Sequence, residues 1–259
     1  MKKSLFVSLF FFIFTVKSFT QVAYKPQAGY AEDFVKSIET AHNTHNFNKN
    51  KAISFDIEVT WGGKPNLQAT VTSLTSSGKV KLQTANGGVV LFDGKDFYLN
   101  ADPNGYKRAR FDIMTWHYFF FVPFKLRDKG VMVERDIDRL SEDTPYNTAK
   151  MTFAKGTGDS PDDWYMLYKN MQTNRLEGMA YIVTFGGKKP DEATPHAITY
   201  HDWTTLDGVP FPTTWKFREW SAEKGFSTVL GEGKIKNIRW VKNLKGVFEV
   251  PTGSTKITQ

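Results

Sequence analysis

The chain has 259 residues, no cysteine and a formal net charge of +7. The absence of cysteine excludes disulfides, thiolate metal sites, cysteine nucleophiles and the acylated cysteine of a bacterial lipoprotein. Three of the positive charges belong to Lys2, Lys3 and Lys17, and the first twenty residues contain no acid, so residues 21–259 carry +4. This positive charge is much smaller than that of a nucleic-acid-binding protein, whose basic residues cluster on one surface.

The first twenty residues have the pattern of a secretory signal peptide. Lys2 and Lys3 make the start basic, residues 5–16 form an apolar run, and Ser18 and Thr20 offer small side chains near a cleavage site. The run is too short to span a bilayer. We therefore predict that residues 1–20 are removed, with cleavage near Thr20 or Ala23. Residues 21–259 are then expected to form a single domain that is soluble in the periplasm or outside the cell, and we assign it to the periplasm.

The next segments predict one helix followed by an antiparallel meander. Residues 30–47 repeat apolar side chains every three or four positions, as in an amphipathic helix that ends in the Asn-rich residues 43–50. Residues 51–61 alternate apolar and polar side chains, which is typical of a strand with one buried face. Turn pairs such as Asn86-Gly87 and Asp93-Gly94 separate further strands. These are predicted at residues 67–74, 79–84, 89–92 and 96–100.

The second half continues with short strands and turns. Strands are predicted at residues 131–136, 150–154, 164–169, 176–185 and 196–203, then in a segment that ends at Trp220, and at 226–241. Short strands at this spacing favour a mainly β fold. We predict an antiparallel meander that forms an incomplete (half) β-barrel with an N-terminal helix.

An aromatic stretch at residues 111–126 interrupts the strands. Six of the nine residues from 116 to 124 are aromatic. Each aromatic side chain buries about 150–250 Å², so the stretch must be covered by the rest of the fold. Pro123 cannot continue a helix, so any helix here is predicted to be brief and to end near Phe121. We interpret the stretch as a short apolar plug inside the sheet, which is either pure core or core that also touches a ligand.

Several motifs resemble a known superfamily. They are Asp163-Trp-Tyr-Met-Leu-Tyr-Lys169, Leu176-Glu-Gly-Met-Ala-Tyr181, Tyr200-His-Asp-Trp203 and Gly208-Val-Pro-Phe-Pro-Thr-Thr-Trp-Lys-Phe217. Together with the signal peptide, the helix and the meander, they resemble the lipoprotein-carrier (LolA/LppX-like) superfamily. Residues 118–131 are similar to a segment of an uncharacterised family of exported proteins from Bacteroidota. The resemblance covers most of residues 30–242. It implies an incomplete β-barrel whose apolar concave face, partly closed by helices, shelters acyl chains, and it supplies no catalytic residue.

The histidines give weak evidence for a metal site. His42 and His45 are three residues apart on the predicted helix, but no third ligand accompanies them. We therefore interpret them as part of a solvated helix end. His196 and His201 lie five residues apart on one predicted strand and are expected to face opposite sides. We assign no metal ligand and no cofactor.

The loop at residues 155–163 contains Gly158-Asp-Ser-Pro161 and the acids Asp159, Asp162 and Asp163. The motif lacks the glycines that follow a serine-protease nucleophile, and an ordinary turn explains it as well. The three acids are candidates for calcium, although a polar loop is the simpler interpretation.

Two groups of basic residues alternate along predicted strands. They form either a solvated face or a rim that receives an anionic headgroup beside the apolar cavity. They are Lys107, Arg108 and Arg110 in one group, and Lys234, Lys236, Arg239, Lys242 and Lys245 in the other.

From these observations we expect an exported, non-enzymatic protein that binds or carries an amphiphile, a lipid or a lipoprotein acyl chain, with transient contact with the envelope membrane. The alternatives are a secreted hydrolase, using the 155–163 loop or His117, and an envelope scaffold whose barrel is filled by its own side chains. No nucleic-acid partner is expected. The residues expected to line the apolar cavity are Trp61, Trp116, Phe119, Phe120, Phe121 and Phe124.

Overall fold

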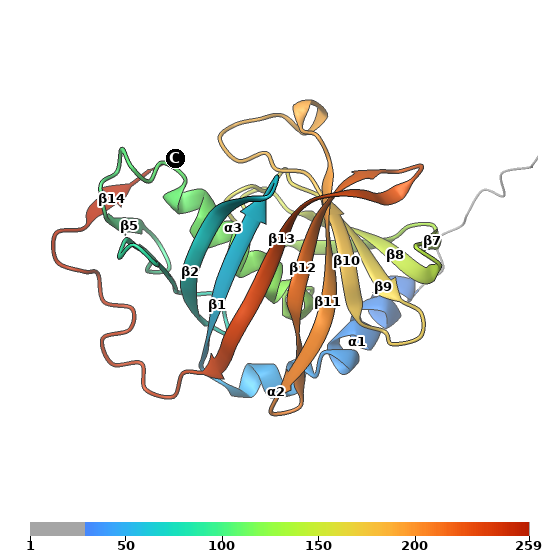
Figure 1. Cartoon of the computed structure of the whole chain (residues 1–259). Coiled ribbons are helices and arrows are strands. Elements are labelled where there is room, and N and C mark those ends of the chain that lie inside the picture. Colours follow the sequence, from blue (N-terminus) through green and yellow to red (C-terminus); the bar gives the residue numbers. More distant parts are fainter. Residues whose placement is uncertain (1–28, 259) are drawn as a thin grey trace, which may run out of the picture.

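The computed structural model describes residues 29–258, so the predicted signal peptide lies outside the described residues. The predicted meander is confirmed: the strands form one antiparallel sheet that curves without closing into a barrel (Figure 1). The first strands are β1 (Ala52–Trp61), β2 (Lys64–Leu74), β3 (Val80–Thr84), β4 (Val89–Phe92) and β5 (Phe97–Asn100). The others are β6 (Val131–Arg135), β7 (Arg139–Ser141), β8 (Thr144–Phe153), β9 (Tyr165–Asn170), β10 (Leu176–Tyr181), β11 (His196–Leu206), β12 (Val209–Ser221), β13 (Gly225–Trp240) and β14 (Thr255–Ile257).

Two meanders meet at the centre of the sheet. Strands β1 to β5 pair in chain order on one side, and β8 to β13 pair in chain order on the other. Strand β1 joins them by pairing with β13, so that Ile53 lies opposite Trp240 and Trp61 opposite Gly231. At the outer edges, β14 pairs with β5, while β6 and β7 pair with β8. The two meanders therefore form one sheet through a pairing between segments far apart in the sequence.

The helices cover the concave face and one end of this sheet (Figure 1). They are α1 (Tyr30–Ala41), α2 (Thr44–Lys49), α3 (Ala109–Phe121) and the short 3₁₀ segment η1 (Val122–Phe124). A second 3₁₀ segment, η2 (Pro190–Glu192), lies in the projecting loop between β10 and β11. The single helix predicted over residues 30–47 is broken, because Asn43 adopts a left-handed backbone conformation with φ of 50°. No helix within residues 29–258 is long and apolar enough to cross a membrane.

Helix α3 is the aromatic stretch, and it lies inside the curve of the sheet. Its predicted end at Phe121 is confirmed, and Pro123 follows in η1. The helix is longer than predicted because it begins at Ala109, so the basic residues Arg108 and Arg110 lie at its start rather than on a strand. A helix that is apolar around most of its circumference is typical of a buried position. The curved sheet supplies that position.

The core lies between α3 and the strands behind it. Phe120 is 2% exposed and stacks on Phe55, with ring centroids 4.0 Å apart, and on Phe211, with ring centroids 5.1 Å apart. On the side nearer to α2, Phe47 stacks on Phe124 at 3.8 Å. These stacked rings fill the concave side of β1 and β12 with the protein's own side chains.

Candidate functional site

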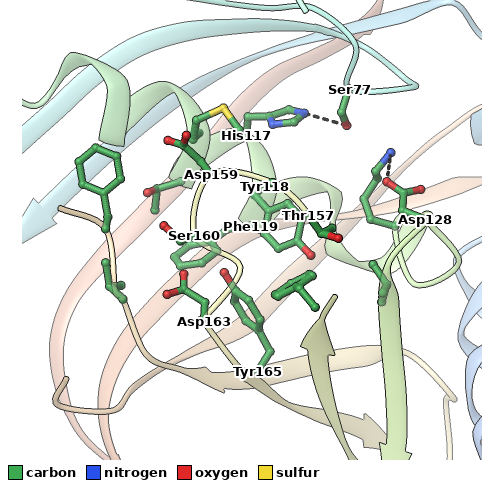
Figure 2. Close-up of a pocket in the computed structure, with 18 of the residues that line it drawn as sticks. Ser77, His117, Tyr118, Phe119, Asp128, Thr157, Asp159, Ser160, Asp163 and Tyr165 are labelled. Atoms are coloured by element: carbon green, nitrogen blue, oxygen red, sulfur yellow. Dashed lines mark hydrogen bonds and ion pairs between the residues drawn. The ribbon is translucent and has the colours of Figure 1, made fainter. Parts of the chain in front are cut away.

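A pocket of about 260 Å³ lies beside α3, on the half of the sheet formed by β6, β8 and β9. Figure 2 shows its labelled polar residues around the end of the 155–163 loop and the side of α3. The volume is just below the range of about 300–1,000 Å³ typical of small-molecule sites. The lining residues with apolar or aromatic side chains are Phe111, Met114, Tyr118, Phe119, Val131, Phe153, Tyr165, Val183 and Phe185. Most of the remaining lining residues are polar, so the pocket is amphipathic.

Helix α3 presents one of its faces to this pocket. Phe111, Met114, Thr115 and Tyr118 line it, and their spacing places them along one side of a helix. Two side-chain hydrogen bonds involve this helix, the first within it and the second from strand β11. The Trp116 indole N–H donates to Asp112 Oδ1 at 3.0 Å, and the Tyr200 hydroxyl donates to the backbone oxygen of Phe119 at 2.7 Å. The second bond satisfies a carbonyl group in the last turn of the helix, where no intrahelical donor remains.

A histidine and a lysine lie at one side of the pocket. His117 is 2% exposed, and its Nε2 lies 3.1 Å from the Ser77 hydroxyl oxygen. Burial, with a smaller effect from the Lys125 charge, lowers the pKa of His117 to about 3. The Lys125 ammonium pairs with Asp128 at 2.7 Å and donates to the Ser76 backbone oxygen at 3.3 Å. The imidazole is therefore neutral at pH 7, and the lysine charge is already compensated.

The 155–163 loop supplies two carboxylates with different environments. Asp159 forms an ion pair with Arg110, which also lies over the Phe97 ring. Asp163 accepts hydrogen bonds at Oδ1 from the Thr184 backbone N–H and the Thr184 hydroxyl, both at 2.7 Å. Burial raises the pKa of Asp163 despite these two hydrogen bonds. The loop is thus anchored to both α3 and the segment that follows β10.

The contact between Ser77 and His117 resembles part of a nucleophile and general-base pair. Such a pair needs a base with a pKa near the working pH and a third group that orients the ring. The pKa of His117 is far below that range, and its buried Nδ1 has no hydrogen-bond partner among the described residues. The geometry gives a weak base without an orienting carboxylate, and it offers little support for hydrolysis.

The sequence-predicted cavity residues occupy three different environments. Phe119 lines the pocket. Trp116, Phe120, Phe121 and Phe124 are buried in the core, and none of these four is a lining residue. Trp61 is 39% exposed at the end of β1, where its ring packs near Phe217 and His196.

His42 and His45, the weaker candidates for a metal site, lie in different environments. His42 is fully buried, so the expectation of a solvated helix end is wrong for this residue; its Nε2 accepts a hydrogen bond from the Leu176 backbone N–H at 3.0 Å. His45 is exposed. Within residues 29–258, no three His, Asp or Glu side chains are grouped closely enough to hold a metal ion.

Sequence reasoning missed most of the pocket wall. Tyr118 belongs to the aromatic stretch and Tyr165 to a predicted strand, but neither was selected as a lining residue. The helical spacing of 111, 114, 115 and 118 is the signal that identifies the α3 face, once the start of the helix is known. The opposite wall has no such signal, because Phe153, Tyr165 and Val183 come together only through strand pairing.

Comparisons with known proteins identify the fold. No protein-family model matches the chain, and no curated protein matches it. A LolA superfamily protein of Nitrosomonas europaea is similar in structure, with a TM-score of 0.53 and 11% identity, over 85% of this chain and 97% of that one. A domain assigned to outer-membrane lipoprotein sorting in Vibrio parahaemolyticus gives a TM-score of 0.51 and 11% identity, over 84% and 96% of the two chains. The chain therefore has a LolA-like fold, as its resemblance to that superfamily predicts.

Proposed function

We propose that this protein binds and carries an amphiphile, a lipid or the acyl part of a lipoprotein, with the apolar chain in the pocket beside α3. The observation that carries the proposal is the amphipathic pocket itself, which has aromatic and aliphatic walls and polar groups at its side. Each methylene removed from water contributes about 0.8 kcal/mol. A pocket of about 260 Å³ holds part of an acyl chain, so the rest of the ligand extends from it.

The fold supports this proposal, since one of the similar structures is assigned to lipoprotein sorting. The alternatives are less well supported. A hydrolase needs a better base than a histidine with a pKa of about 3. A scaffold filled entirely by its own side chains needs no amphipathic pocket, although the stacked rings around Phe120 do fill the neighbouring part of the sheet.

We also propose that residues 1–20 are a signal peptide and that the mature protein acts in the periplasm. This rests on the basic start and the apolar run of the sequence. The mass of the protein purified from the cells that produce it tests the proposal. A mass that corresponds to a chain beginning near residue 21 or 24 supports it, and a mass that includes residues 1–20 contradicts it.

Filling the pocket should abolish ligand binding without unfolding the protein. Val183 is half-buried and lines the pocket, so Val183→Trp should place an indole ring in the space for the acyl chain. We expect the affinity for a fluorescent fatty acid to fall at least tenfold, measured by titration.

The matched control is Val229→Trp. Val229 is 44% exposed on β13 and is not a lining residue of the pocket, so this variant should bind the probe as the wild type does. Equal binding by the wild type and both variants, with native circular dichroism, would place the ligand elsewhere. Absence of binding to the wild type would contradict the proposed function.

A further inference from the structure

The pocket contains one carboxylate that has no positively charged partner. The lining side chains include three carboxylates and two lysines. Asp128 is paired with Lys125 at 2.7 Å, and Asp159 is paired with Arg110. Asp163 accepts hydrogen bonds from Thr184 alone. It forms no ion pair within residues 29–258. Lys129, the other lining lysine, is exposed and takes part in no ion pair within residues 29–258. The lining therefore carries one unpaired positive charge that is exposed and one unpaired negative charge that is half-buried.

The two oxygens of Asp163 differ in their environment. Oδ1 accepts both hydrogen bonds from Thr184, and Oδ2 accepts none from the described part of the chain. A half-buried carboxylate is costly unless a cation or donors compensate it. The cost is visible in the raised pKa of Asp163, whose main cause is burial and to which the neighbouring Asp162 charge adds. A cationic ligand would supply the missing compensation.

Aromatic rings lie around this carboxylate. Tyr118, Phe153 and Tyr165 form a cluster in which the ring centroids are 5.7 to 6.4 Å apart. Figure 2 shows Tyr118 and Tyr165 with Asp163 on the pocket wall. The Asp163 charge acts on both tyrosines, since it helps to raise their pKa values. Aromatic faces beside a carboxylate are a favourable environment for an organic ammonium ion.

The Tyr118 hydroxyl adds a second unused polar group. Its oxygen is buried and has no hydrogen-bond partner among the residues that the structure describes. A buried hydroxyl without a partner costs free energy that a ligand donor can recover. Together, Asp163 Oδ2 and the Tyr118 oxygen provide two acceptors in a mostly apolar wall. A primary ammonium group carries three N–H donors, so it can donate to Asp163 Oδ2 and still has donors for a second acceptor such as the Tyr118 oxygen.

We propose that the amphiphile bound in this pocket has a primary amine head group, held by Asp163 and Tyr118, with its apolar chain along the α3 side of the pocket. This inference rests on the proposed function and narrows it to a ligand class. The amine differs from the anionic head group considered for Arg108 and Arg110. Arg110 is paired with Asp159, and Arg108 with Asp112 at 3.1 Å, so neither arginine is available as a simple receptor for an anion.

The test compares ligands that differ only in their head group. Isothermal titration with dodecylamine, dodecanol and dodecanoate, each below its micelle concentration at pH 7, should show the amine binding at least tenfold more tightly than the carboxylate. Equal affinities, or tighter binding of the carboxylate, would overturn the head-group inference and leave the proposed function standing. Failure of all three ligands to bind would contradict the proposed function instead.

Substitution of the carboxylate sharpens the test. Asp163→Asn keeps an oxygen for the Thr184 donors but removes the charge, so we expect dodecylamine binding to weaken at least tenfold and dodecanol binding to change less than twofold. Asp162→Asn is the matched control, because Asp162 is the adjacent exposed acid and does not line the pocket. An equal loss for the amine and the alcohol in Asp163→Asn would show a structural effect and overturn the inference. If Asp163→Asn fails to fold, the head-group comparison on the wild type still decides.

Discussion

Phe120→Ala should lower the free energy of unfolding by about 3–5 kcal/mol, the cost of removing a large aromatic side chain from a packed core. Phe120 is 2% exposed and lies between the rings of Phe55 and Phe211. The truncation leaves a cavity that these two stacked neighbours cannot easily close. Urea denaturation measures the effect as a lower midpoint with an unchanged m-value.

Phe185→Ala is the matched comparison for this prediction. Phe185 is half-buried, lines the pocket and packs against Phe111 with ring centroids 5.7 Å apart. Its truncation should cost less than half as much stability and should weaken ligand binding. The opposite result is a Phe120→Ala variant that keeps its stability but no longer binds the ligand. It would mean that Phe120 lines the ligand cavity, as the sequence alone predicts.

Protonation of His42 and His117 in the unfolded state should destabilise the protein by about 5 kcal/mol between pH 7.5 and pH 4.5, before the opposing effect of two buried acids. Burial lowers the pKa values of His42 and His117 to about 3 in the folded state, whereas an unfolded histidine titrates near 6.5. The unfolded state therefore binds more protons as the pH falls below 6.5, and stability is lost progressively toward pH 3. Each histidine contributes about 1.4 kcal/mol per pH unit in this window.

The structure gives the reason why these imidazoles resist protonation. His42 Nε2 accepts the Leu176 N–H, and its ring lies near Phe124 and Trp203. Two acids act in the opposite direction at low pH, because burial raises the pKa values of Asp112 and Asp163. Their protonation in the folded state offsets part of the loss at the acid end of the window.

Denaturation curves from pH 4.5 to 8 measure this dependence. His42→Gln keeps an acceptor for Leu176 and should remove about half of the slope below pH 6.5, while its stability curve runs parallel to that of the wild type above pH 7. An unchanged slope in His42→Gln would show that this histidine is not the titrating group. A wild type with flat stability down to pH 4.5 would contradict the assignment of both histidines as buried and neutral.

Local patterns predicted most of the strands. The alternation in residues 51–61 corresponds to β1 (Ala52–Trp61), and the Asn-Gly and Asp-Gly pairs correctly separate β3, β4 and β5. The short edge strands β7 (Arg139–Ser141) and β14 (Thr255–Ile257) were missed, since three residues are too few to show a period. Proline explains the end of α3, but its start at Ala109 has no comparable signal.

The candidate site was harder to predict, because it depends on contacts between distant segments. An aromatic stretch indicates burial, but it does not show whether a ring faces a neighbouring strand or an empty space. Phe119 lines the pocket while Phe120, the next residue, lies in the core. Trp61 shows a related difficulty: alternation predicts the face of a strand but not that the residue lies at its exposed end. The sequence marks Asp163 only as one of three acids that could bind calcium, because its contact with Thr184 and its position beside the tyrosines depend on the fold.

The central claim is that the pocket beside α3 holds an amphiphile. Native mass spectrometry of the wild-type protein, purified without detergent from the cells that produce it, tests this claim most directly when it is followed by organic extraction. We predict a stoichiometric mass above that of the polypeptide, an extract that contains an amine-bearing lipid or acylated species, and loss of the extra mass in Val183→Trp. A bare polypeptide mass, with no uptake of added dodecylamine, dodecanol or fluorescent fatty acid, would contradict the claim and favour a scaffold filled by its own side chains.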